Sequence, residues 1–179
     1  MRKKLLWITE TAIMLALLVT LQWATKPLGQ IVTGSCVNAV LAVSALLVGL
    51  PGGLTVALLS PVFAFLFGIA PNPIIVPVIM AGNCCFVALV RRYRKDSVVH
   101  KVSVMLAAAV AKFAVMYVLV QWVICGALAQ PLLEQGILKQ PMLKMLPATF
   151  GVLQLVTALI GGSVSLLLVP VLKKALHRK

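Results

Sequence analysis

Long apolar runs, separated by short polar or glycine- and proline-rich segments, most constrain the fold of this chain. A helix needs about 20 largely apolar residues to cross the hydrocarbon core of a bilayer. Because 62% of the residues are hydrophobic, folding around one soluble core would leave much apolar surface in water. The sequence therefore predicts an all-α integral membrane protein, with one transmembrane domain over residues 1–179. The six predicted transmembrane helices are residues 5–25, 32–50, 54–69, 74–90, 98–128 and 146–172.

Helix-breaking segments set the limits of these six helices. Proline and glycine are strong breakers, and polar runs mark loops. The predicted breaks are KPLGQ at 26–30, PGG at 51–53, APNP at 70–73, RRYRKD at 91–96 and QPLLEQGILKQP at 130–141. Two helices are expected to be irregular. The third is short and contains Pro61, so it is expected to be short, kinked or re-entrant, and the long fifth must tilt or project beyond the membrane.

The charges are distributed very unevenly along the chain. Sixteen Lys and Arg face three Asp and Glu, a formal net charge of +13. The bases cluster at the ends of apolar runs and not along a soluble surface, which argues against a nucleic-acid partner. With an even number of crossings both termini lie on one side, and the positive-inside rule places that side in the cytoplasm. The clusters are Arg2 to Lys4, then Arg91, Arg92, Arg94, Lys95 and Lys101, then Lys173, Lys174, Arg178 and Lys179.

The first apolar run begins after the basic segment MRKK, so a cleavable secretory signal is an alternative interpretation of the N-terminus. The run continues to about Ala24, and no small-residue cleavage pattern precedes that point. The prediction is a helix that stays in the mature protein.

Two small residues lie four positions apart in this first run, in the stretch AIMLA from Ala12 to Ala16. Residues four apart share one face of a helix. Helices in a membrane associate through close packing at small residues, because lipid tails are as apolar as leucine side chains. Ala12 and Ala16 are therefore a candidate docking surface for a partner. The alternative is that they pack within the bundle.

The AIMLA motif, the chain length and the basic ends together resemble the S components of energy-coupling factor (ECF) transporters. The resemblance extends to residues 33–69, TGSCVNAVLAVSALLVGLPGGLTVALLSPVFAFLFGI, which is similar to the second and third helices of S components with their glycine-rich hairpin. PVIMAGN at 77–83 is similar to the fourth helix.

This resemblance implies a subunit of an importer in the bacterial plasma membrane that captures a vitamin or related micronutrient from outside. The partners it implies are a transmembrane T component, whose coupling helices pack on Ala12 and Ala16, and two ATPase subunits. ATP would be used by those subunits. The sequence contains no glycine-rich phosphate loop, so no cofactor is expected in this chain.

One lysine lies deep in a predicted helix. Lys112 is eleven positions beyond Lys101, about 17 Å at roughly 1.5 Å per residue, and therefore near the midplane. An ionised lysine there costs roughly 2.5–3.5 kcal/mol and usually faces a cavity or a partner. The same arithmetic puts Asn38 and Asn83 at a middle depth. The acids Glu10, Asp96 and Glu134 all lie near the inner surface or in loops.

We therefore expect a cavity open to the outside, in which Lys112 neutralises a carboxylate or phosphate of the solute and the amides contact the remainder. The alternative is that the amides join helices and that Lys112 binds backbone carbonyls or water. Tryptophans in such positions are more often interfacial anchors or part of helix packing than ligand contacts. Nearer the outer mouth, the candidate residues are Gln22, Trp23, Lys26, Trp122 and Gln154.

Other function classes fit the sequence less well. An intramembrane enzyme is not expected, because His100 and His177 lie at cytoplasmic ends and no acid lies at depth. All four cysteines lie in apolar runs without C-x-x-C spacing, which predicts buried side chains and no metal site. A self-sufficient secondary carrier would show inverted halves and a coupling acid. The remaining alternative is a non-transporting scaffold subunit with an S-component-like fold.

Overall fold

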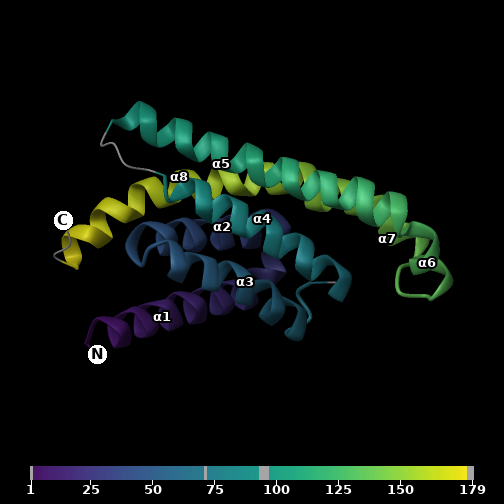
Figure 1. Ribbon diagram of the computed structural model, residues 1–179, viewed down its shortest axis with the longest axis horizontal. Coiled ribbons are helices and arrows are strands. Elements are labelled where there is room, and N and C mark those ends of the chain that lie inside the picture. Colours follow the sequence, from purple (N-terminus) through teal and green to yellow (C-terminus); the bar gives the residue numbers. More distant parts are fainter. Residues whose placement is uncertain (1, 71, 93–96, 177–179) are drawn as a thin grey trace.

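The computed structural model describes residues 2–70, 72–92 and 97–176, and all the regular structure in these ranges is helical (Figure 1). The main helices are α1 (Arg2–Thr25), α2 (Gln30–Leu47), α3 (Leu50–Leu66), α4 (Val76–Val90), α5 (Val98–Val118), α6 (Ala129–Glu134), α7 (Gln140–Pro147) and α8 (Leu153–Ala175). The shorter segments are the 3-10 turns η1 (Lys26–Leu28) and η2 (Pro73–Ile75) and the π-helical segments η3 (Leu119–Ala127) and η4 (Ala148–Val152).

Five helical segments of the described chain are long and apolar enough to cross a membrane, which confirms the predicted membrane-helix class. They are Lys4–Leu28, Gln30–Leu47, Pro73–Val90, Val98–Ala127 and Gln140–Ala175. The third predicted span also forms an apolar helix, but α3 has only 17 residues. The sixth crossing therefore stays a prediction.

The hairpin between α2 and α3 differs from the prediction. PGG at 51–53 was expected to break the chain, yet these residues lie inside the first turn of α3. The turn is made instead by Gly49, whose φ of 102° is in the left-handed region that glycine adopts without a steric penalty. Pro51 fits the first turn of a helix because its missing N–H would have no intrahelical partner there.

The polar segment at 130–141 was also predicted wrongly as a plain break. It contains α6, a turn at Gly136, and the start of α7 at Gln140. Leu132, Leu138 and Leu146 are buried in one apolar cluster with Val120 and Ile124, so packing stabilises helical structure that polar composition disfavours.

This extension gives the molecule two long arms at the end away from both termini (Figure 1). The helical segments Val98–Ala127 and Gln140–Ala175 contain 30 and 36 residues. At about 1.5 Å per residue they are roughly 45 and 54 Å long, against about 30 Å of hydrocarbon. The fifth helix was expected to tilt or project, and the arms extend beyond the ends of the other helices.

The bundle is organised around α2, which packs against α1, α3, α4 and α8. The main apolar core lies between these helices and α5, and includes Leu18, Leu41, Val56 and Phe86. Both termini lie at one end of the bundle (Figure 1). The assignment of that end to the cytoplasm rests on charge and stays a prediction.

Candidate functional site

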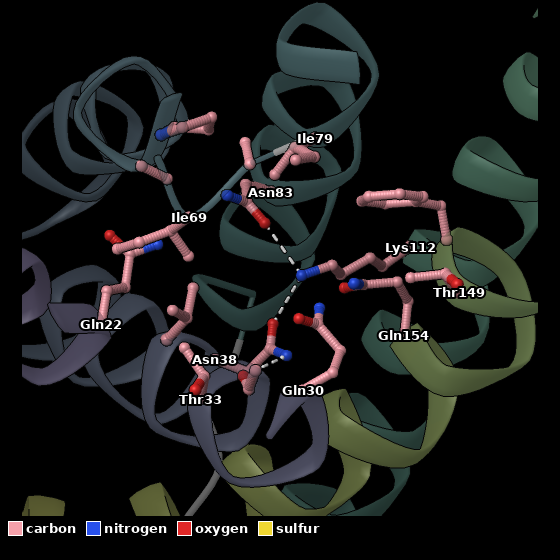
Figure 2. A pocket seen from close by; sticks show the side chains of 16 residues that line it. Gln22, Gln30, Thr33, Asn38, Ile69, Ile79, Asn83, Lys112, Thr149 and Gln154 are labelled. Atoms are coloured by element: carbon pink, nitrogen blue, oxygen red, sulfur yellow. Dashed lines mark hydrogen bonds between the residues drawn. The ribbon is translucent and has the colours of Figure 1, made fainter. Parts of the chain in front are cut away.

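The Lys112 side chain is held at the junction of three helices (Figure 2). Its Nζ donates to Asn38 Oδ1 of α2 at 2.6 Å and to Asn83 Oδ1 of α4 at 2.8 Å. Only 1% of the residue is exposed. The Phe86 ring lies 5.8 Å from Nζ, a distance at which the ring face attracts a cation. The ammonium therefore reaches neither headgroups nor bulk solvent, as the cavity hypothesis requires.

Asn38 is fixed by partners on two helices. Its Nδ2 donates to the Gly34 carbonyl at 2.9 Å and to Thr157 Oγ1 of α8 at 3.2 Å. With Nδ2 engaged in this way, Oδ1 is directed at Lys112. The amide can stand there because α2 and α8 approach closely at Gly161, where an added Cβ would lie 2.7 Å from the Ala39 backbone nitrogen.

Asn83 is held differently. Its Oδ1 accepts from Lys112, but its Nδ2 is buried without a hydrogen-bond partner. The preceding residue, Gly82, allows α5 to approach α4, because an added Cβ would lie 2.6 Å from Met116 Sδ. An unsatisfied buried donor costs about 1–3 kcal/mol, so this amide is ready to bind an acceptor.

A cavity of about 290 Å³ adjoins these three side chains. Polar residues from α1, α2 and α8 complete its wall, and Gln22 lies on the side of the view away from Lys112 (Figure 2). None of the described residues that line it is acidic. The lining residues are Gln22, Gln30, Thr33, Gly34, Val37, Asn38, Pro61, Ala64, Ile69, Ala70, Ile79, Asn83, Lys112, Thr149, Phe150 and Gln154.

In its ionised form Lys112 has only part of its charge compensated by the residues around it. Lys112 has three N–H donors, and the two amide oxygens occupy two of them. An amide oxygen carries a dipole and no net charge. A ligand anion would therefore supply the negative charge that the two asparagines do not provide. Gln22 Oε1 is also buried without a partner, and it offers an acceptor to a ligand donor.

Five of the eight predicted solute-binding residues line this cavity: Gln22, Asn38, Asn83, Lys112 and Gln154. Lys26, Trp23 and Trp122 do not. Lys26 Nζ donates to the Gly68 carbonyl at 2.9 Å and so joins the α1–α2 link to the α3–α4 link. Trp23 and Trp122 are 67% and 73% exposed on the surface of the bundle, where an interfacial anchor would lie.

The two alanines of the first helix face outward. Ala12 and Ala16 are exposed, whereas Thr11, Leu18 and Gln22 form the buried face of α1. The alternative that Ala12 and Ala16 pack inside this bundle is therefore wrong. Their surface is open to a partner, and the docking role itself stays a prediction.

Several cavity residues were missed from the sequence. Gln30 was assigned to a loop, although α2 begins there, and Thr33 and Thr149 were not considered. Thr157, which accepts from Asn38 but does not line the cavity, was not considered either. Helical spacing could have found the first two, because residues 30, 33, 34, 37 and 38 form one face of α2. Thr149 lies within the unforeseen π-helical segment η4 and had no such signal.

Comparison with protein-family models, curated proteins and solved structures found no match to this chain. The resemblance to S components therefore rests on the motifs alone. Within the described residues, no group of three or more His, Cys, Asp and Glu could hold a metal ion.

Proposed function

We propose that this chain is the solute-binding subunit of an ECF-type importer, which captures a vitamin or related micronutrient, anionic in character, from outside the cell. The supporting observation is the cavity of about 290 Å³ with Lys112 at its wall and no acid among the lining residues that the structure describes. A buried charge without a protein counter-ion is expensive in a membrane. A carboxylate or phosphate on the solute would remove that cost when it binds.

The chemistry of the wall suggests how the solute lies. The third N–H of Lys112 and the free Nδ2 of Asn83 would donate to the anionic group. Val37, Ile79 and Phe150 supply apolar contact for the rest of the molecule. The cavity is lined by the first turns of α2 and the last turns of α1, at the end away from the basic termini. Positive-inside orientation makes this the outer end.

Transport would require partners. A T component would dock on the exposed α1 face at Ala12 and Ala16, and two ATPase subunits would provide the energy. The face is suitable because small residues let helix backbones approach closely.

The test begins with binding. Purified protein is screened by thermal shift and calorimetry against carboxylated, phosphorylated and neutral micronutrients, beside Lys112→Met and the control Lys144→Met. Lys144 lies exposed on α7 outside the cavity lining. We expect an anionic compound to bind wild type and the control but not Lys112→Met. The importer proposal fails if no compound binds and tagged protein recovers no ATPase subunits.

The docking step is tested separately by Ala12→Leu/Ala16→Leu. Solute affinity should stay within twofold, while recovery of ATPase subunits and solute uptake are lost. Ala107→Leu/Ala114→Leu adds the same bulk to exposed positions of α5 and should leave both unchanged. Equal loss in both variants would contradict a specific role for the alanine face.

A scaffold subunit that does not transport is the second candidate. The observation that favours it is that Lys112 already joins α2, α4 and α5 through two hydrogen bonds, as a purely structural lysine would. A scaffold should lose stability in Lys112→Met without any solute dependence.

A further inference from the structure

The cavity contains a second polar group, away from Lys112, that the protein itself leaves unpaired. Gln22 of α1 lines the cavity and is 7% exposed, and its Oε1 is buried without a hydrogen-bond partner. It continues the buried face of α1 that Thr11 and Leu18 form, where an apolar side chain would need no partner. A buried acceptor without a partner destabilises the folded protein. Packing alone therefore does not explain a glutamine at this position.

Gln22 and Lys112 reach the cavity from different sides of the bundle. α1 packs against α2 and α3, whereas α5 packs against α4 and α8. The two side chains are accordingly well separated in the view (Figure 2). The described lining residues from α3 and from the link after it have only apolar side chains: Pro61, Ala64, Ile69 and Ala70. Gln22 is therefore the polar group that a solute meets on the α1–α3 side.

The amide of Gln22 can recognise a particular kind of chemical group. A glutamine amide offers N–H and C=O side by side, and rotation about its last side-chain bond exchanges their places. It can therefore form two hydrogen bonds at once with a flat edge that presents a donor beside an acceptor, as glutamine does with adenine. Lactams, cyclic ureas and oxo-heterocycles have such an edge, with N–H beside C=O. An ionised carboxylate has acceptors only, so it cannot satisfy Gln22 Oε1.

We propose that the solute has two binding groups, a carboxylate held by Lys112 and Asn83 and an amide-like edge, with N–H beside C=O, held by Gln22. This inference rests on the proposed function and narrows the solute to a carboxylated lactam, cyclic urea or oxo-heterocycle. The one lysine of the described lining matches the single charge of a carboxylate better than the nearly double charge of a phosphate monoester. The volume of about 290 Å³ is close to the lower limit for ligand pockets, so the solute is small.

Calorimetry with two matched sets of compounds tests the proposal. Orotate carries a carboxylate and, across its ring, an N–H between C=O groups, whereas benzoate has only the carboxylate and uracil only the amide-like edge. The compounds 5-(2-oxoimidazolidin-4-yl)pentanoate, pentanoate and 2-imidazolidinone place the same groups further apart. In at least one set, the compound with both groups should bind wild type at least about tenfold more tightly than either partial compound, because a partial compound leaves buried polar groups unpaired.

Gln22→Met tests the assignment to this side chain, since methionine has similar length and cannot pair with the edge. Because it removes an unpaired buried acceptor, the melting temperature without solute should be unchanged or higher. A glutamine that stabilised the bundle would give a lower one. The advantage of the compound with both groups over its carboxylate analogue should fall below about twofold. Thr20→Met, at an exposed position of α1 outside the cavity lining, is the control and should keep the full advantage.

Two results would overturn this inference and leave the importer proposal standing. One is equal binding of carboxylates with and without the amide-like edge. The other is an unchanged advantage in folded Gln22→Met, which would mean that another residue binds the edge. If no carboxylate of either kind bound wild type, the anionic site at Lys112 would itself be wrong, and this inference with it.

Discussion

The cavity beside Lys112 and an apolar groove between α1 and α8 are two hollows of similar volume, about 290 and 330 Å³, on opposite faces of α2. Residues 30, 33, 34, 37 and 38 of α2 line the cavity, and residues 35, 36, 39, 40 and 43 line the groove. Helical periodicity alone separates the two sets. Asn38 and Ala39 are adjacent in the chain yet belong to different chemical environments.

The difference shows how a membrane protein distributes its polar groups. In the cavity Lys112 donates to both Asn38 and Asn83, whereas the described residues of the groove expose only apolar atoms. A polar group on the lipid side would have no partner, whereas an apolar one loses nothing there. Polar side chains therefore gather at the enclosed hollow on one face of α2, and the hollow on its other face is apolar.

The largest expected effect is that of replacing Lys112, which should affect the cavity and not the groove. Lys112→Met should weaken binding of whichever anionic solute wild type binds by 30-fold or more, because losing a buried charged partner costs about 2 kcal/mol or more. Calorimetry measures this. Val164→Phe, which alters only the groove, should change solute affinity less than twofold. A loss below fivefold in Lys112→Met would mean that the solute does not contact the ammonium.

The second prediction concerns Gly161 of α8, which packs closely against α2 between the two hollows. Gly161→Ala places a methyl group against the Ser35 carbonyl and the Ala39 nitrogen, which are backbone atoms and cannot rotate away. Overpacking of this kind should destabilise the protein by about 1–3 kcal/mol. Thermal unfolding in detergent should show the loss, and solute affinity should fall with it.

Gly126→Ala is the matched control, because its added methyl would meet only the Gln121 carbonyl, at an ordinary 3.5 Å. It should be neutral or slightly stabilising, since alanine loses less backbone freedom than glycine. If Gly161→Ala behaved like this control, the close contact of α2 with α8 would not support either hollow.

The sequence predicts much of the fold because the membrane restricts the choices. Apolar length identified the helices, and the depth of Lys112 correctly suggested that it shares a level with Asn38 and Asn83. The residues at which helices begin and end were less predictable. Breaks depend on backbone conformation, so Gly49 and not PGG makes the α2–α3 turn.

The side of a helix on which a residue lies was harder to predict than its depth in the membrane. Trp23 and Gln22 are neighbours in sequence and depth, yet Gln22 is buried and Trp23 is exposed. The face of α1 that turns inward is set by its packing against α2 and α3. A depth estimate contains no information about that packing. The helical arm at α6 and α7 was missed because its stability comes from tertiary contacts, which polar composition conceals.

The third prediction compares the two asparagines. Asn38→Leu should destabilise the bundle more than Asn83→Leu by about 1 kcal/mol, because Asn38 also bonds Gly34 and Thr157, and such bonds in membranes average about 0.6 kcal/mol each. Unfolding titrations of the two variants give this difference. Asn83→Leu should instead affect solute affinity, through the lost Nδ2 donor. Equal stability of the two variants would show that the contact of Asn38 with α8 does not contribute to the free energy of unfolding.

The smallest expected effect belongs to the groove wall. Leu17→Ala should change the free energy of unfolding by less than about 0.5 kcal/mol, because an exposed leucine at the lipid surface exchanges contact with protein for contact with lipid tails of the same polarity. Leu18→Ala is the adjacent comparison. Leu18 is fully buried in the core, and its truncation should cost about 2–5 kcal/mol by leaving a cavity. Thermal unfolding of the pair measures how differently the two sides of α1 contribute, and similar losses would mean that the groove wall is packed as tightly as the core.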